Sequence, residues 1–157
     1  MSVDAATSLV AFFVRGRRCA LPLAAVEQIC ALVDISTVPH APAVLAGLID
    51  VHGAPVPVFD LSRRIDGKAG EYGLDARLVL GRTARRPFAI LAEAVEGVVQ
   101  VSADSIAVMT RLVPGAGHVP DVATAGDGLI FIHDPETLLT ANEEADLDAA
   151  LRRGSPA

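Results

Sequence analysis

The second half of the sequence repeats part of the first half. When Leu9 is aligned with Leu78 and no gaps are allowed, seven positions are identical: Leu9, Val10, Arg17, Ala20, Ala25, Val26 and Glu27 match Leu78, Val79, Arg86, Ala89, Ala94, Val95 and Glu96. We call this superposition the repeat alignment. An apolar strand, a basic turn, a second strand and an Ala-Val-Glu segment recur in that order. Because each copy of a repeat forms one supersecondary unit, the pattern predicts two similar lobes packed on each other.

Short β segments separated by turns account for the first sixty residues. Residues 9–14 and 18–21 are apolar and flank Arg15-Gly16-Arg17, a pattern typical of a hairpin with a charged tip. Residues 23–29 begin as a helical turn and continue as an extended stretch to residue 33, with Val26, Ile29 and Leu32 as candidate core positions. Prolines at 39, 42, 55 and 57 exclude long helices and restrict strands there to edges or interruptions.

Residues 47–61, GLIDVHGAPVPVFDL, predict a second hairpin. Apolar residues on both sides of His52-Gly53 place one apolar face around a turn. Residues 66–75 then combine three Gly with charged residues and few bulky side chains, which is typical of a solvated linker. We therefore expect a lobe boundary in residues 66–75.

The end of the chain carries helix start patterns. Asp134-Pro135-Glu136 offers a capping carboxylate, a proline suited to the first helical position and an acid near the positive end of the helix dipole. A helix of about residues 142–153 should follow, with acids first and bases last. Its expected inward residues are Ala145, Leu147, Ala150 and Leu151.

Composition excludes several classes of protein. The net charge of −6 and the absence of Trp argue against nucleic-acid binding, which needs a basic face and stacking platforms. Apolar runs such as residues 41–49 stop after about nine residues, too few to cross a bilayer, and the N-terminus does not fit a secretory signal, so we expect a cytoplasmic protein. Cys19 and Cys30 lie among apolar neighbours, and we expect both to be buried thiols.

Candidate catalytic or metal-binding residues are few. The side chains that could build a metal or acid-base site are His40, His52, His118 and His133 with Asp50, Asp60 and Asp134. Asp50 and His52 would share a strand face, but no further ligand spacing completes a site, and Asp60 and Asp134 fit helix caps. The sequence has no nucleophile elbow and no nucleotide-binding loop. A small barrel that binds an apolar ligand is a further alternative, although barrels of this size fill their interiors with side chains.

The order and spacing of several motifs resemble the CheW-like domain family. The motifs are the first hairpin, the V-x-x-I segment, a pair of prolines, the Gly-hydrophobic hairpin and a strand that ends in Pro-Val-Phe-Asp-Leu. The matching stretches are residues 9–22, 26–29, 38–42, 47–61, 91–101 and 128–139. The resemblance therefore extends over nearly the whole chain.

The resemblance implies a mostly β fold of two five-stranded SH3-like β-barrel lobes that share a core, with short helices and a C-terminal helix. We place lobe 1 at about 8–66, lobe 2 at about 75–140 and the helix at about 142–153. It implies a non-enzymatic adaptor, without cofactor or metal, that couples chemoreceptors to a CheA-type histidine kinase. Such a protein would be recruited from the cytoplasm to receptor arrays at the inner membrane. The alternatives are a CheW-like module of another two-component pathway and a metal-dependent enzyme.

The resemblance also implies partner-binding residues, which in this sequence are Val26, Gln28, Ile29, Asp50, His52 and Gly53. The chain departs from the family here. The family's acid two residues after the Val is replaced by Gln28, with Glu27 one place earlier, and its Asn-hydrophobic-Arg-Gly hairpin reads Asp50-Val51-His52-Gly53. His52 cannot hold a carboxylate as an arginine fork does at every pH. Val26 and Ile29 could instead be core residues, and Gly53 could serve only the turn.

Overall fold

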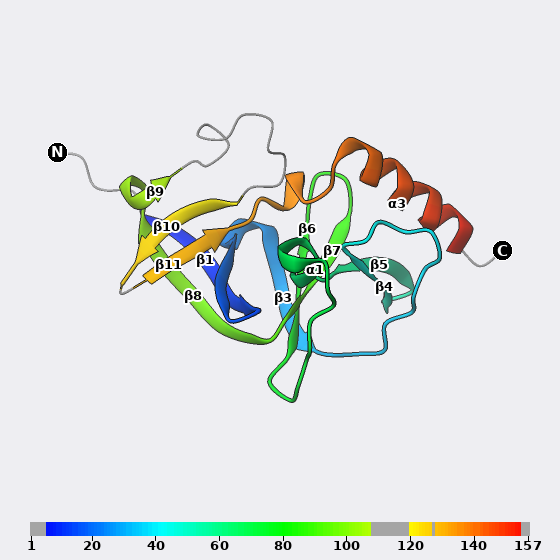
Figure 1. The fold of residues 1–157 in the computed structure, drawn as a ribbon, viewed down its shortest axis with the longest axis horizontal. Coiled ribbons are helices and arrows are strands. Elements are labelled where there is room, and N and C mark those ends of the chain that lie inside the picture. Colours follow the sequence, from blue (N-terminus) through cyan, green and yellow to red (C-terminus); the bar gives the residue numbers. More distant parts are fainter. Residues whose placement is uncertain (1–5, 108–119, 127, 155–157) are drawn as a thin grey trace.

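The computed structural model describes residues 6–107, 120–126 and 128–154, in which β-strands dominate (Figure 1). In chain order the elements are β1 (Ala6–Val14), β2 (Arg17–Pro22), η1 (Leu23–Ala25), β3 (Val26–Ala31), β4 (Leu45–Val51), β5 (Ala54–Phe59), α1 (Ser62–Asp66), β6 (Arg77–Arg82), β7 (Pro87–Ala92), β8 (Ala94–Ser102), η2 (Ala103–Ser105), β9 (Ile106–Ala107), β10 (Asp121–Ala125), β11 (Gly128–Ile132), η3 (Pro135–Thr137) and α3 (Ala141–Gly154). The prediction of a mostly β chain with a C-terminal helix is confirmed.

The strands form two sheets, which define two lobes. The first lobe has the strand order β8-β1-β2-β11-β10-β9, where β9 is a two-residue edge, and the second lobe has the order β3-β6-β7-β5-β4. The first lobe therefore combines the start of the chain with its second half, and the ranges 8–66 and 75–140 do not coincide with the two sheets. The expected ranges assumed that consecutive strands stay together, whereas β8 pairs with β1 and β3 pairs with β6.

The two lobes are built on one register. Leu9 pairs with Pro22 in β1 and β2, and their counterparts in the repeat alignment, Leu78 and Leu91, pair in β6 and β7. The third strand is exchanged between lobes in both directions, because Leu9 also pairs with Val99 of β8 while Leu78 pairs with Cys30 of β3. The repeat in the sequence therefore corresponds to a structural repeat.

Both predicted hairpins are present, and each has a two-residue turn with positive φ. Arg15 and Gly16 have φ of 55° and 71°, and His52 and Gly53 have φ of 52° and 86°. Such turns match the twist of antiparallel strands and favour a glycine at the second position. Pro55 and Pro57 lie where β5 pairs with β4, while β5 pairs with β7 through Val58 and Phe59.

A shared core joins the lobes, as the sequence led us to expect. Phe12 of the first lobe and Phe88 of the second belong to the same buried cluster. The cluster also includes Leu138 and Leu147, which follow the last strand. Smaller clusters fill each lobe, with Leu78 in the second and Leu9 in the first. The lobes therefore fold as one unit.

The expected linker at residues 66–75 packs against the second lobe. Asp60 is 1% exposed and accepts hydrogen bonds from Gly70 N at 3.0 Å and from the Tyr72 hydroxyl at 2.5 Å. It also accepts from Ser62, whose backbone N lies at 3.1 Å. The segment connects β5 to β6 within one sheet, so the boundary expected there is wrong. The glycine and charge content of residues 66–75 did not reveal that Tyr72 anchors this segment through its hydrogen bond to Asp60.

The helix α3 lies over the second lobe (Figure 1). Leu147 and Ala150 are buried as expected, whereas Ala145 is exposed. Arg86 donates to Glu144 and Asp148, each at 2.5 Å, and so fixes the helix from its polar side. Asp134 accepts from Glu136 N at 2.9 Å and caps η3, as the sequence predicts.

Candidate functional site

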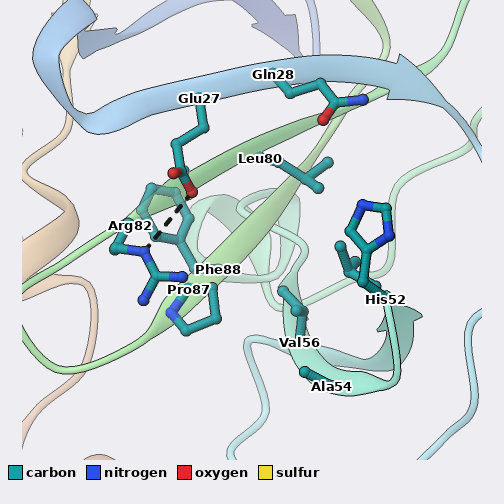
Figure 2. A pocket seen from close by; sticks show the side chains of 11 residues that line it. Glu27, Gln28, His52, Ala54, Val56, Leu80, Arg82, Pro87 and Phe88 are labelled. Carbon is teal, nitrogen blue, oxygen red and sulfur yellow. Dashed lines mark ion pairs between the residues drawn. The ribbon is translucent and has the colours of Figure 1, made fainter.

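A groove runs between β3 and the hairpin of β4 and β5, and we call it the hairpin groove. Its larger hollow has a volume of about 410 Å³ and is lined by Glu27, Gln28, Val51, His52, Ala54, Val56, Leu80, Gly81, Arg82, Pro87 and Phe88. A second hollow of about 190 Å³ shares Gln28, Val51, His52 and Leu80 with it. Figure 2 shows Gln28 and His52 on opposite sides of Leu80, with Glu27 and Arg82 farther along.

Three of the six predicted partner-binding residues line this groove. Gln28 and His52 line both hollows, and Asp50 lines the smaller one. Gly53 lies at the hairpin turn and is exposed. The fold thus brings together two segments that lie far apart in the sequence.

Asp50 and His52 also have local roles in the hairpin. Asp50 Oδ1 accepts a hydrogen bond from Gly53 N at 2.7 Å, which holds the turn closed. His52 adopts a φ of 52°, in a region where histidine occurs more often than bulky residues. The side chain of His52 is exposed, so the turn presents an imidazole at the rim of the groove.

Glu27 occupies a β-bulge, where the register shifts between Val26 and Gln28. Glu27 Oε1 lies 3.8 Å from Arg82 Nε, and both side chains are more than half exposed, so the ion pair contributes little to stability. Opposite the bulge, a Cβ on Gly81 would lie 2.2 Å from the Ala25 carbonyl oxygen and 2.7 Å from the Phe88 ring. This close approach explains why position 81 is a glycine.

Ile29 lies on β3, at the edge of the second sheet. It pairs with Val79, which is fully buried, and paired residues share a sheet face. Ile29 nevertheless is 41% exposed, because β3 is an edge strand and nothing in the described residues covers its outer side. The expectation that Ile29 and Leu32 are core residues is therefore wrong, whereas Val26 is partly buried against the shared core.

The repeat identifies a residue that the sequence interpretation missed. Val98 of β8 is equivalent to Ile29 in the repeat alignment, pairs with buried Val10 and is 61% exposed. Both residues therefore lie on the core-side faces of edge strands. Applying the repeat to Ile29 would have found Val98 from the sequence. Leu80 and Phe88 were also missed, because they line the groove only once β6 and β7 have folded next to β3 and the hairpin of β4 and β5.

The candidate metal and thiol residues have ordinary structural surroundings. Within the described residues no group of three or more His, Cys, Asp and Glu side chains could hold a metal ion, and His118 lies outside them. Burial lowers the pKa of His133 to about 4, so its imidazole is neutral at pH 7. Burial raises the pKa of Cys19 to about 12, whereas Cys30 is only partly buried. His40, with a φ of 61°, is exposed in a turn.

Comparison with known proteins gives a consistent family assignment. The family model described as CheW-like domain matches residues 8–143. A protein named Chemotaxis protein CheW from Rhizobium meliloti (strain 1021) is 31% identical over 94 residues, which are 60% of this chain and 61% of that protein. A Probable chemotaxis protein CheW from Rhizobium etli (strain ATCC 51251 / DSM 11541 / JCM 21823 / NBRC 15573 / CFN 42) is 24% identical over 98 residues, 62% of this chain and 63% of that protein. The matches thus span about three fifths of these curated relatives.

The fold has a close structural counterpart. The crystal structure of scaffolding protein TtCheW from Thermoanaerobacter tengcongensis matches with a TM-score of 0.76 at 22% identity. The match covers 88% of this chain and 96% of that chain. Among the described residues no helix is long and apolar enough to span a membrane.

Proposed function

The chain belongs to the CheW-like domain family, and on that premise we propose that it is a non-enzymatic adaptor that couples chemoreceptors to a CheA-type histidine kinase. The family match over residues 8–143 is the observation that carries this proposal. The names of the two curated relatives and of the structural neighbour, which refer to chemotaxis and to a scaffolding protein, agree with it. An adaptor of this kind works in the cytoplasm and is recruited to receptor arrays at the inner membrane.

An adaptor needs surfaces for two partners, and the second lobe offers two adjacent ones. One is the hairpin groove, which combines the apolar Leu80 with a polar rim of Gln28 and His52. The other is the uncovered edge of β3, where Ile29 is 41% exposed. Interfaces of specific complexes have an apolar centre and a polar rim, and their affinity depends on a few anchor residues. We assign the partner-binding role to Val26, Gln28, Ile29, Asp50, His52 and Gly53, in which Val26 supports β3 from the core side.

The hairpin tip sets the chemistry of recognition. Where the family carries an arginine, His52 offers an imidazole with at most two hydrogen-bond donors in place of the five donors of a guanidinium. Where the family carries an acid on β3, Gln28 offers an amide. At these two positions the partner therefore meets neutral hydrogen-bonding groups in place of the charged side chains of the family.

A second candidate function is adaptor work in a two-component pathway other than chemotaxis. The departures at Gln28 and His52 favour it, because both lie in the groove assigned to partner contact. In that case the chain binds a kinase regulatory domain but does not bring a kinase to chemoreceptors.

Titration with the regulatory domain of a CheA-type kinase tests the proposal. We expect binding at micromolar strength or tighter by the folded chain. Ile29→Asp should weaken binding about tenfold or more, since it places a charge in an apolar contact. Leu129→Asp is the matched control, because Leu129 is 55% exposed on β11 of the other lobe and its substitution should leave the affinity unchanged. No binding at high concentration, or equal effects of the two substitutions, would contradict the assignment.

A further inference from the structure

A separate pocket lies in the first lobe beside α1, and we call it the α1 pocket. It has a volume of about 250 Å³ and is lined by Arg17, Cys19, Leu61, Arg64, Ile65, Pro120, Phe131 and His133. It shares no lining residue with the hairpin groove. The proposed adaptor function therefore leaves this pocket without a role.

The structural repeat gives the α1 pocket a counterpart in the second lobe. Arg86 and Phe88 are equivalent to Arg17 and Cys19 in the repeat alignment. Ile132 pairs with Ala20 as Val58 pairs with Ala89, so Val58 and Ile132 are also equivalent. Counting on from these two residues makes the following pairs equivalent: Phe59 and His133, Arg64 and Leu138, Ile65 and Leu139. One pocket in the second lobe, with a volume of only about 20 Å³, is lined by Phe59, Arg86, Phe88, Leu138 and Leu139.

The counterpart pocket is small because α3 covers it. Glu144 of α3 lines it and accepts from Arg86 at 2.5 Å, and Asp148, one turn later, accepts from the same guanidinium at 2.5 Å. Between these two acids, Leu147 is fully buried in the shared core. The helix thus places two carboxylates against Arg86 and buries the apolar Leu147 beside them.

Within the described part of the chain, no equivalent helix follows α1. Leu139 leads into α3, whereas α1 ends after its equivalent Ile65, where Gly67 adopts a φ of 76° as the C-cap. The chain then turns toward Asp60, which accepts from Gly70 N at 3.0 Å. In the first lobe the chain therefore turns away from the α1 pocket. At the equivalent position in the second lobe the chain continues into α3, which covers the counterpart pocket.

Arg17 retains the chemistry that Arg86 uses. Its guanidinium carbon lies 5.6 Å from the centre of the Phe131 ring, and its side chain is exposed. Throughout residues 6–107, 120–126 and 128–154, no carboxylate lies within ion-pair distance of Arg17, whereas neighbouring Arg64 donates to Glu143 at 2.6 Å. The pocket thus presents an available cation above the apolar Leu61, Ile65 and Phe131.

We propose that the α1 pocket is a docking site for an acidic amphipathic helix of a partner protein, seated as α3 is seated on the second lobe. Two carboxylates one turn apart on that helix pair with Arg17, and an apolar residue between them enters the pocket toward Leu61 and Ile65. The surface is distinct from the hairpin groove and from the edge of β3. An adaptor with this site holds a third contact in addition to the two assigned above.

A peptide of residues 140–154, which carries Glu144, Leu147 and Asp148, serves as the probe. We add it with both ends blocked to the isotope-labelled full chain and follow backbone amide shifts by NMR at low salt. The expected result is saturable binding that moves the amide signals around Leu61, Ile65, Phe131 and His133. Arg17→Glu should weaken binding about tenfold or more, because a charge-assisted contact becomes a repulsion. Arg82→Glu, an equal charge change at the hairpin groove, is the matched control and should have no such effect.

A second peptide distinguishes specific docking from general charge attraction. Substitutions Glu144→Gln and Asp148→Asn in the peptide keep its shape and should abolish the shifts at the α1 pocket. The proposal is overturned if the original peptide does not bind at millimolar concentration, or if Arg17→Glu and Arg82→Glu weaken it equally. It is also overturned if the shifts are confined to Phe88 and Leu138, since the peptide would then only exchange with α3.

Discussion

The two lobes have one strand order and one register but differ in what covers them. In the first lobe Phe12 of β1 faces Cys19 of β2, and in the second Gly81 of β6 faces Phe88 of β7, so the aromatic residue has changed strands. The charged side chains at the surface of the two lobes differ as well. Arg86 is covered by α3, whereas its equivalent Arg17 is exposed. The comparison shows that the repeat conserves backbone pairing, while side-chain volume and surface chemistry diverge under it.

The largest expected effects are in the shared core, to which Phe12 of the first lobe and Phe88 of the second both contribute. Phe12→Ala and Phe88→Ala should each lower the free energy of unfolding by about 3–5 kcal/mol, because each leaves a cavity in the same cluster. Chemical denaturation followed by far-UV circular dichroism measures the loss. A loss below about 1 kcal/mol for either variant would show that the lobes do not share the cluster.

Equivalent aspartates should differ in importance. Asp60 is buried and accepts from Ser62, Gly70 and Tyr72, whereas Asp134 is exposed and caps η3. Asp60→Ala should cost about 3 kcal/mol because it leaves several buried donors unpaired. Asp134→Ala should cost about 1 kcal/mol, the usual value for a cap. Equal losses in thermal or chemical unfolding would contradict the difference drawn between the two positions.

The same aspartate predicts a pH dependence. Burial alone would raise the pKa of Asp60, but hydrogen bonds from Ser62, Tyr72 and Gly70 outweigh it and hold the pKa below its usual range. The carboxylate therefore stabilises the fold above the unfolded-state pKa of about 3.9, and this contribution is lost as pH falls through the folded-state pKa. Unfolding curves measured from pH 7 down to acid should show a larger loss for the wild type than for Asp60→Asn. Parallel loss in both would contradict the prediction.

Substitution of the equivalent residues Arg86 and Arg17 should affect stability to different extents, because Arg86 is paired with α3 and Arg17 is exposed. Arg86→Ala should destabilise the protein by about 1 kcal/mol, because it removes the contacts to Glu144 and Asp148 that fix α3. Arg17→Ala should change stability by less than about 0.5 kcal/mol. Thermal unfolding of both variants checks the contrast. A larger loss for Arg17→Ala would mean that Arg17 already has an internal role.

How far the sequence predicted the fold depends on whether the contacts are local. The hairpin turn at His52-Gly53 was predicted because the glycine that favours positive φ and the alternating apolar residues of the strands lie next to each other in the sequence. The lobe ranges failed because the pairing of Leu9 with Val99 joins positions that no local pattern connects. The spacing of apolar residues made Ile29 a candidate core position. It does share a sheet face with buried Val79, but β3 is an edge strand with no neighbour to cover that face.

The candidate site was predicted in part for the same reason. Gln28, Asp50 and His52 were named through the family resemblance, and they line one groove. The resemblance could not supply Leu80 or Phe88, whose contribution arises from β6 and β7 lying beneath the groove. A pattern in one segment does not specify which other segment folds against it.

The smallest effect on stability is expected at the hairpin tip. His52→Arg should change the free energy of unfolding by less than about 0.5 kcal/mol, because the side chain is exposed. It should nevertheless change affinity for the kinase regulatory domain, since a permanent cation with several donors replaces an imidazole. Titration calorimetry and thermal unfolding of one preparation give both numbers. Parallel changes in stability and affinity would count against a contact role for His52.

Sedimentation of a CheA-type kinase with receptor-bearing membranes tests the adaptor function most directly. The kinase and the membranes are mixed with the wild-type chain, with Ile29→Asp, with Leu129→Asp, or without the chain. We expect the wild type and Leu129→Asp to bring the kinase into the pellet and Ile29→Asp to do so much less. A kinase that stays in the supernatant with the folded wild-type chain, or pellets equally without it, would contradict an adaptor role.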